Sequence, residues 1–247
     1  FSIISLTFFS SFPGGVLNAF IYLLSPISTL SNTVRFIYIF ECCGTKEIDF
    51  SNIEYEINSK KDKCLSSTIC PPDKPYIYLK NNHIPGYFRA TKDWDLLIIS
   101  PKGNLIAAIE LKSQVGSYGN NLNNRTEESL GSSEDFWTAF REGSFRCNQS
   151  PWLGYMMVVG KDDGSTHEVK VSEPHFEVRP EFKGTTYLDR YRILCERLVL
   201  EHKYSAVGLI ATSGKNHYES LCDRISIDSF ISSFRGHLLG FENEFIG

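Results

Sequence analysis

The chain has 247 residues, and its 25 lysines and arginines against 29 aspartates and glutamates give a formal charge of −4. Its 42% hydrophobic and 22% charged residues exclude a disordered chain, a collagen-like fibre and a polytopic membrane protein. The length suffices for one large domain, or for one domain with an appendage. The mildly acidic total, taken alone, disfavours a nucleic-acid partner, because phosphate binding usually requires an excess of lysine and arginine.

The seven cysteines are odd in number and include no CxxC pair. Such usage supports neither a disulfide framework nor a common zinc site. Reduced thiols are the simpler interpretation, and they predict a cytoplasmic protein.

Residues 1–43 are an atypical apolar segment, in which Arg35 is the first charged side chain. A signal peptide would carry lysine or arginine before its apolar stretch. The apolar stretch at 16–30 is short for a membrane span and contains Pro26. We expect this segment to derive from a truncated or misread reading frame, with a membrane anchor as the less favoured alternative.

The next part of the chain predicts a short amphipathic helix over 48–61 and a strand over 76–80. Two apolar runs follow, at 94–100 and 105–111, and Pro-Lys-Gly-Asn at 101–104 separates them. Proline and glycine in so short a connection indicate a β-hairpin.

A polar loop is expected over 119–125. The sequence then predicts a helix that is capped by Ser132 or Ser133 and ends at Gly143. The continuous apolar run at 152–159 is typical of a buried strand.

After a long polar connection at 161–186, apolar spacing predicts a helix from Tyr187 to about Lys203. A buried strand at 206–211 and a last helix at about 225–239 complete the chain. This order indicates an α/β sandwich with a central mixed β-sheet flanked by helices.

The predicted hairpin brings ionisable groups together. If Ser100 lies opposite Leu105, paired positions sum to 205, so Asp95 lies opposite Glu110. Alternation along the strand places Glu110 and Lys112 on the same face. One face of the hairpin is therefore expected to carry Asp95, Glu110 and Lys112.

By the same register Asp93 lies opposite Lys112. Two facing carboxylates repel each other, and Asp95 and Glu110 offer the hard oxygen ligands that Mg²⁺ prefers. Lys112 could hold or deprotonate an attacking water and stabilise negative charge on phosphorus. The alternative is a salt-bridge cluster on a solvated face, which short patterns of this kind often form.

Asp95 with Glu110-Leu111-Lys112 matches the PD-(D/E)xK nuclease motif. The surrounding residues resemble type II restriction endonucleases of the XhoI group, and the clearest likeness lies in PGYFRATKDWDLLII at 85–99, in IAAIELKSQVGSYGNNLNNRTEESLGSSEDFWTAFREG at 106–143 and in VSEPHFEVRPEFKGTTYLDRYRIL at 171–194. The resemblance implies a restriction-endonuclease-like fold, with residues 44–247 as the endonuclease domain.

The resemblance further implies a Mg²⁺-dependent homodimer that hydrolyses double-stranded DNA at CTCGAG and leaves 5′-phosphate ends. Asp95 and Glu110 match the metal ligands and Lys112 the catalytic lysine. A cognate DNA methyltransferase would belong to the same restriction system. Two alternatives remain open: an inactive DNA-binding remnant of such an enzyme, and a less specific repair or recombination nuclease of the same superfamily.

Amide and guanidinium groups follow the lysine closely, and such groups suit adenine and guanine edges in the major groove. The candidate DNA-binding residues are Gln114, Asn120, Asn121, Asn123, Asn124 and Arg125. Glu127 and Glu128 could add a carboxylate to the site, although charges at a helix start would explain them as well. A specific DNA reader needs such local groups and not a basic total, so the charge of −4 no longer argues against DNA.

Overall fold

The structure is a computed structural model of the whole chain. It describes residues 2–8, 11–12, 15–16, 18–25, 35–41, 76–78, 82–100, 102–147, 149–214 and 217–241. Side chains are described from residue 82 onward, apart from 101, 148, 214–217 and 242–247. The helix expected over 48–61 lies outside the described residues.

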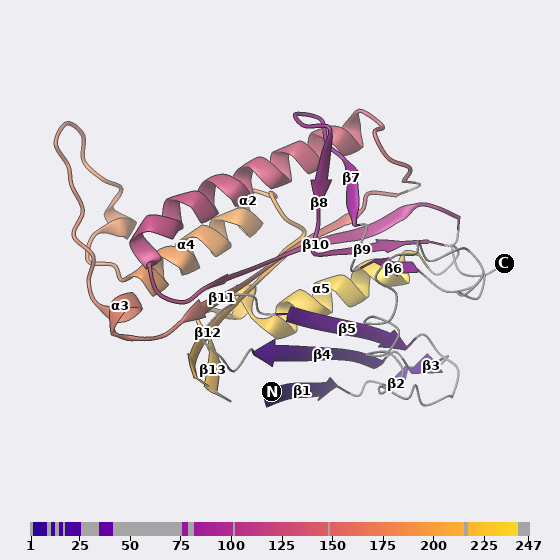
Figure 1. Ribbon diagram of the computed structural model, residues 1–247, viewed down its shortest axis with the longest axis horizontal. Helices are drawn as coiled ribbons and strands as arrows, with labels where there is room; N and C mark the ends of the chain where they lie inside the picture. The colour runs from indigo at the N-terminus through magenta and orange to yellow at the C-terminus, as the bar shows by residue number, and fades with distance from the viewer. Residues whose placement is uncertain are drawn as a thin grey trace.

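A six-stranded mixed sheet forms the centre of the protein (Figure 1). In spatial order its strands are β13 (His217–Ser220), β12 (Ala206–Gly214), β11 (Trp152–Gly160), β10 (Leu105–Gln114), β9 (Leu96–Ile99) and β6 (Tyr76–Tyr78). β10, β11 and β12 run parallel to one another, while β6, β9 and β13 pair antiparallel with their neighbours. The predicted fold class is thereby confirmed.

Helices cover both faces of this sheet (Figure 1). α2 (Tyr118–Arg141) and α4 (Tyr187–Leu200) lie on one face, and α5 (Ile227–Leu239) lies on the other. Three short helical segments complete the described chain: α3 (Asp163–Thr166), η1 (Pro180–Phe182) and η2 (Asp223–Ile225). The predicted helices at 187–203 and 225–239 are confirmed to within a few residues.

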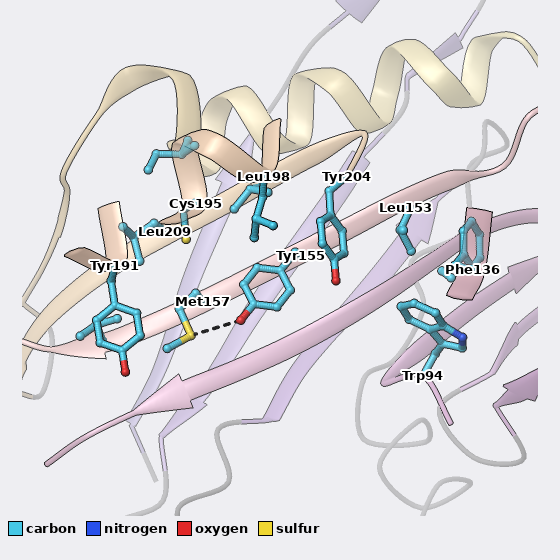
Figure 2. Packing of buried hydrophobic residues seen from close by; sticks show 14 of the residues in the cluster. Trp94, Phe136, Leu153, Tyr155, Met157, Tyr191, Cys195, Leu198, Tyr204 and Leu209 are labelled. Atoms are coloured by element: carbon cyan, nitrogen blue, oxygen red, sulfur yellow. Dashed lines mark hydrogen bonds between the residues drawn. The ribbon is translucent and has the colours of Figure 1, made fainter. Parts of the chain in front are cut away.

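Alternation along β10 divides its apolar side chains between the two helical layers. Ala108 packs with the cluster under α2 and α4, which Figure 2 shows around Tyr155 and Tyr191. Ile109 packs with the cluster against α5. The same alternation sends Glu110 to the α2 side of the sheet.

β11 is buried along its whole length because it has parallel neighbours on both edges and helices on both faces. Gly154 is required within it: a Cβ there would lie 2.3 Å from the Trp152 ring and 3.0 Å from Phe230 of α5. The continuous apolar run at 152–159 therefore predicts this strand correctly.

The start of α2 was predicted wrongly. The helix begins at Tyr118, so the run at 119–125 is helical and not a loop. Ser132 and Ser133 lie inside the helix and are buried, and Ser133 Oγ donates to the Leu130 carbonyl. A serine in the interior of a helix cannot be its N-cap, and its hydroxyl bonds instead to a carbonyl one turn earlier. The predicted end is correct, since Gly143 follows the last turn with a φ of +73°.

The N-terminal part of the chain contains five strands in the described residues. A three-stranded antiparallel sheet joins β1 (Ser2–Phe8), β4 (Asn18–Ser25) and β5 (Arg35–Glu41), and β2 (Ser11–Phe12) pairs with β3 (Gly15–Val16). The stretch weighed as a membrane anchor thus contains a strand. None of the described helices is both long and apolar enough to cross a bilayer.

Candidate active site

The β9–β10 hairpin has the expected register where it matters for the site. Ile98 pairs with Ala107 and Leu96 with Ile109, so paired positions sum to 205. Near the turn the register is shifted by one, and Ile99 rather than Ser100 pairs with Leu105. An irregularity at Ile106 absorbs the difference, as a β-bulge does.

Asp95 lies directly before β9 and beside β10. Its backbone N–H donates to the Ile109 carbonyl at 3.1 Å, and its Oδ2 accepts from the Leu111 N–H at 2.7 Å. The side chain thereby satisfies the N–H donor of Leu111 on β10, at the point just before the first residue of β9. This bond holds the Asp95 carboxylate next to Glu110.

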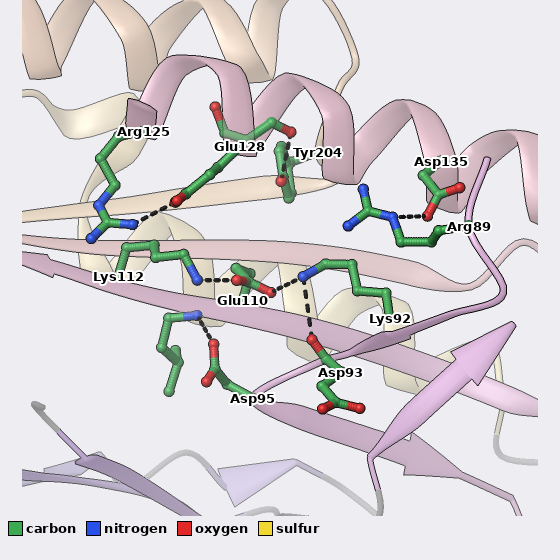
Figure 3. Close-up of polar contacts among 12 residues, drawn as sticks. Arg89, Lys92, Asp93, Asp95, Glu110, Lys112, Arg125, Glu128, Asp135 and Tyr204 are labelled. Carbon is green, nitrogen blue, oxygen red and sulfur yellow. Dashed lines mark hydrogen bonds and ion pairs between the residues drawn. The ribbon is translucent and has the colours of Figure 1, made fainter. Parts of the chain in front are cut away.

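Glu110 is the centre of the site (Figure 3). Its side chain is 6% exposed, and its two oxygens contact different lysines. Oε1 accepts from Lys112 Nζ, and Oε2 accepts from Lys92 Nζ at 2.9 Å. A buried carboxylate is costly unless it is paired, and two ammonium groups supply that pairing.

The electrostatics of Asp95 reflect its neighbours. Although Asp95 keeps contact with solvent, loss of water around its carboxylate raises the pKa. The Leu111 hydrogen bond lowers the pKa, the charge of Glu110 raises it, and those of Lys112 and Lys92 lower it. The two acids and two lysines therefore act on one another, as expected of groups that share one site.

Lys92 is a site residue that the sequence reasoning missed. It belongs to a second hairpin, formed by β7 (His83–Pro85) and β8 (Thr91–Asp93). Its Nζ also lies 4.5 Å from the centroid of the Trp94 ring. The signal for this hairpin is the Pro85–Gly86 dipeptide, which is typical of a turn.

The expected pairing of Asp93 with Lys112 is wrong, because Asp93 lies in this second hairpin. It pairs there with His83, whose Nδ1 is 3.5 Å from its Oδ1. β9 of the six-stranded sheet begins only at Leu96, so Asp93 lies outside that sheet.

The donor set fits a hard divalent cation. Asp95 and Glu110 offer oxygen ligands from neighbouring positions across the hairpin. The described residues contain no larger group, of three or more His, Cys, Asp or Glu, that is arranged to hold a metal. Two carboxylates suit Mg²⁺, which keeps several waters and binds phosphate oxygens. They suit a structural zinc site poorly, because such a site normally has four protein ligands.

Gln114 follows Glu110 and Lys112 on the same face of β10, at its last residue. Its side chain is buried, and Nε2 donates to the Gly116 carbonyl at 2.6 Å. The amide thus fastens the turn between β10 and α2.

The candidate asparagines lie on the first two turns of α2 and divide between two faces. Asn120, Asn123 and Asn124 are exposed, whereas Asn121 is half-buried and its Nδ2 donates to the Ser117 carbonyl at 3.0 Å. Helical spacing gives this division, because residues 120, 123 and 124 are neighbours at intervals of three and four.

Arg125 lies on the inner side of α2 and is also half-buried. It forms an ion pair with Glu128, and Figure 3 shows both side chains above Lys112 and Glu110. Because α2 begins at Tyr118, Glu127 and Glu128 lie in the third turn of the helix rather than at its start, so helix-start electrostatics does not explain them.

Comparisons with known proteins find a family model and several relatives that match this chain. Residues 69–222, more than half of the chain, match the family described as restriction endonuclease XhoI. The chain is 47% identical over 165 residues to the type II restriction enzyme BstVI of Geobacillus stearothermophilus, an alignment that covers 63% of this chain and 74% of that enzyme.

Two further relatives match shorter parts. The type II restriction enzyme XhoI of Xanthomonas vasicola is 43% identical over 143 residues, covering 58% of this chain and 55% of that enzyme. The type II restriction enzyme AbrI of Azospirillum brasilense is 51% identical over 94 residues, covering 38% and 42% respectively. No solved structure matches. The chain therefore belongs to the XhoI family of type II restriction endonucleases, enzymes that cleave DNA by hydrolysis.

Proposed function

We propose that this chain is a Mg²⁺-dependent endonuclease that cuts double-stranded DNA at CTCGAG and leaves 5′-phosphate ends. The observation that carries the proposal is the convergence of Asp95, Glu110 and Lys112 at the β9–β10 hairpin in a member of this family. The sequence CTCGAG follows from the resemblance to the XhoI group.

Asp95 and Glu110 would hold the metal through their carboxylate oxygens. When bound there, Mg²⁺ would supply a Lewis acid that offsets the charge of the scissile phosphate. Lys112 would orient the attacking water and stabilise negative charge on phosphorus. The water oxygen forms the new bond to phosphorus, the bond to the 3′ oxygen breaks, and that oxygen takes a proton as it leaves.

Sequence reading would fall to the amide and guanidinium groups that follow the site. Asn120, Asn123 and Asn124 are exposed on α2, and they are proposed to contact base edges. Gln114, Asn121 and Arg125 are half-buried or buried beside them, and they are proposed to position this end of α2 against the DNA.

A palindromic site is matched by a protein with a two-fold axis, so the working form is proposed to be a homodimer. Its partners would be double-stranded DNA and, in function rather than in a complex, a cognate DNA methyltransferase. The cytoplasm is the proposed compartment.

A plasmid with one CTCGAG site tests the reaction. Linearisation with Mg²⁺ and protection by EDTA are expected, and end labelling should find 5′-phosphates. Random degradation would instead identify a less specific nuclease, whereas a monomer that binds DNA without cutting would identify a remnant.

Glu110→Ala tests the site. The variant should lose cleavage while keeping its fold by circular dichroism, because the metal would lose one of its two carboxylates. Glu219→Ala is the matched control, since Glu219 forms an exposed ion pair with Lys161 on another part of the sheet. Full activity of Glu110→Ala would contradict the assignment.

A further inference from the structure

Two aromatic side chains project into solvent at the tip of the β7–β8 hairpin. Tyr87 is 53% exposed and Phe88 is 68% exposed, and their rings meet edge to face at a centroid distance of 4.9 Å. Large apolar side chains side by side on a surface usually mark a contact with another molecule. The rigid turn that carries these side chains, and their position beside the candidate active site, indicate which molecule they contact.

The turn that carries them is fastened to α2 by one buried carboxylate. Asp135 is 2% exposed, and its Oδ1 accepts from the backbone N–H groups of Tyr87 and Phe88 at 2.8 and 2.7 Å. Its Oδ2 lies 2.9 Å from Arg89 Nε (Figure 3). Three charge-assisted hydrogen bonds to one acid fix the backbone of the turn.

The turn also packs closely against its neighbours, and Gly86 shows how little space is left. A Cβ at Gly86 would lie 2.6 Å from Asp135 Oδ2 and 2.8 Å from the Arg89 carbonyl. The turn therefore sits tightly against α2 and presents its aromatic pair in a fixed position. Such preorganisation lowers the entropy cost of binding through these side chains.

The strand that follows this turn, β8, reaches the active site. Lys92, four residues after Phe88, contacts Glu110 at 2.9 Å. At about 3.3 Å per residue, Phe88 lies at most ~13 Å along the chain from Lys92. Phosphates on one DNA strand are ~3.4 Å apart along the axis, so this distance corresponds to about four nucleotides. A duplex whose phosphate lies at Glu110 would thus pass the aromatic pair within a few base pairs.

We propose that Tyr87 and Phe88 form a rigid aromatic pair that contacts the DNA duplex at a base step beside the cleaved phosphate. Aromatic side chains can wedge against or stack on bases, and the fixed turn would hold them in register with Glu110 and Lys112. The inference rests on the proposed function, and it makes this pair a determinant of how the duplex is positioned.

The test replaces both rings, as Tyr87→Ala with Phe88→Ala in the full chain. Duplexes that carry CTCGAG and 2-aminopurine at single positions in and beside it report binding and base unstacking, with Ca²⁺ in place of Mg²⁺. The double variant should bind about 10- to 100-fold more weakly and lose the 2-aminopurine signal at the contacted step. Cleavage of the plasmid should fall with it.

Two controls accompany the variant. Exchanging the rings, as Tyr87→Phe with Phe88→Tyr, keeps both aromatic faces, so this variant should bind the duplex as tightly as wild type. Leu239→Ala removes a side chain of similar exposure, 61%, from α5 on the opposite face of the sheet, and it should leave binding and cleavage unchanged.

If the wild type cuts at CTCGAG, unchanged binding and 2-aminopurine fluorescence in the double alanine variant would overturn this inference but not the proposed function. A dimeric wild type whose double alanine variant becomes monomeric would also overturn it, because the pair would then join two copies of the chain. A wild type that neither binds nor cuts would overturn the proposed function, and this inference with it.

Discussion

Glu110 shows how a single charged residue is accommodated inside an apolar strand. Ala107, Ala108 and Ile109 before it are fully buried, and a lone carboxylate in such surroundings would carry a large desolvation cost. Lys92 and Lys112 approach it from different strands, one at each oxygen. The lysines therefore stabilise the charge and also fix the direction of both oxygens.

Lys92→Met tests the contribution of the second lysine. The variant leaves Oε2 of Glu110 without its 2.9 Å partner, so the carboxylate is less well oriented. Partners that orient a metal ligand typically contribute about 10- to 100-fold to activity. We expect a loss of that size in cleavage rate at saturating Mg²⁺, measured on the single-site plasmid.

Lys161→Met is the control, because Lys161 also pairs with a glutamate, Glu219, but at an exposed position. It should cut at the wild-type rate. Equal rates for Lys92→Met and wild type would show that Lys112 alone is enough to orient Glu110.

Residue-level geometry was predictable where local pairing determines it. A hairpin with a short turn fixes which residues lie opposite each other, so the nearness of Asp95 to Glu110 could be predicted from the sequence. The bulge at Ile106 was not predictable, but it shifts the register only beside the turn. Lys92 was missed because its approach to Glu110 depends on how one hairpin packs on another.

At the scale of elements, α2 differs most from its prediction. Its first turns are rich in asparagine and glycine, which are weak helix formers and more typical of turns. Packing outweighs this preference, because Tyr118 in the first turn is buried and Leu122 packs against the same core cluster. Farther along the helix, Tyr204 Oη donates to the Ser129 carbonyl at 2.9 Å. β11 and α4 were predicted correctly because their apolar patterns, a continuous run and a helical spacing, agree with how they pack.

Two glycine substitutions compare an open position on α2, Gly131, with a tightly packed position in the turn that lies against α2, Gly86. Outside the adjacent backbone of its own helix, no atom lies within 4 Å of a Cβ added at Gly131, so Gly131→Ala should stabilise the helix by about 1 kcal/mol. Gly86→Ala should instead destabilise the protein by about 1–3 kcal/mol, because its Cβ would overlap Asp135 Oδ2 and the Arg89 carbonyl. Denaturant unfolding of both variants measures the two effects.

The Gly86 variant should also cut more slowly than wild type, since the displaced turn leads directly into β8, which carries Lys92. A Gly86→Ala protein as stable as wild type would mean that the turn can move away from α2 at little cost. A Gly131→Ala protein that is less stable would mean that this face of α2 is covered.

At the scale of the whole molecule, the two helical layers are joined to β10 by different chemistry. The α2 layer faces the polar side chains of Glu110 and Lys112 on β10. The α5 layer contacts β10 through apolar packing and, within the part of the chain that the structure describes, through a polar contact. That contact is His237 Nε2 to the Ile106 carbonyl at 3.0 Å. Because a carbonyl oxygen only accepts, Nε2 carries the proton.

This arrangement makes stability depend on pH. Burial lowers the pKa of His237, and the Ile106 hydrogen bond offsets this only in part. The unfolded chain, with an ordinary histidine pKa of about 6.5, therefore binds a proton before the folded chain does. Stability from this group is complete above pH ~6.5 and is lost as the pH falls toward the lowered pKa.

His237→Gln removes the titratable imidazole and retains a side chain that can donate a hydrogen bond to the Ile106 carbonyl. At pH 7.5 the variant should be less stable than wild type, because packing against Phe241 is lost. The gap in melting temperature should narrow as the pH is lowered to 5, since only the wild type has this histidine to protonate. A gap in melting temperature that stays constant between pH 7.5 and pH 5 would show that burial of the His237 ring does not couple α5 to pH.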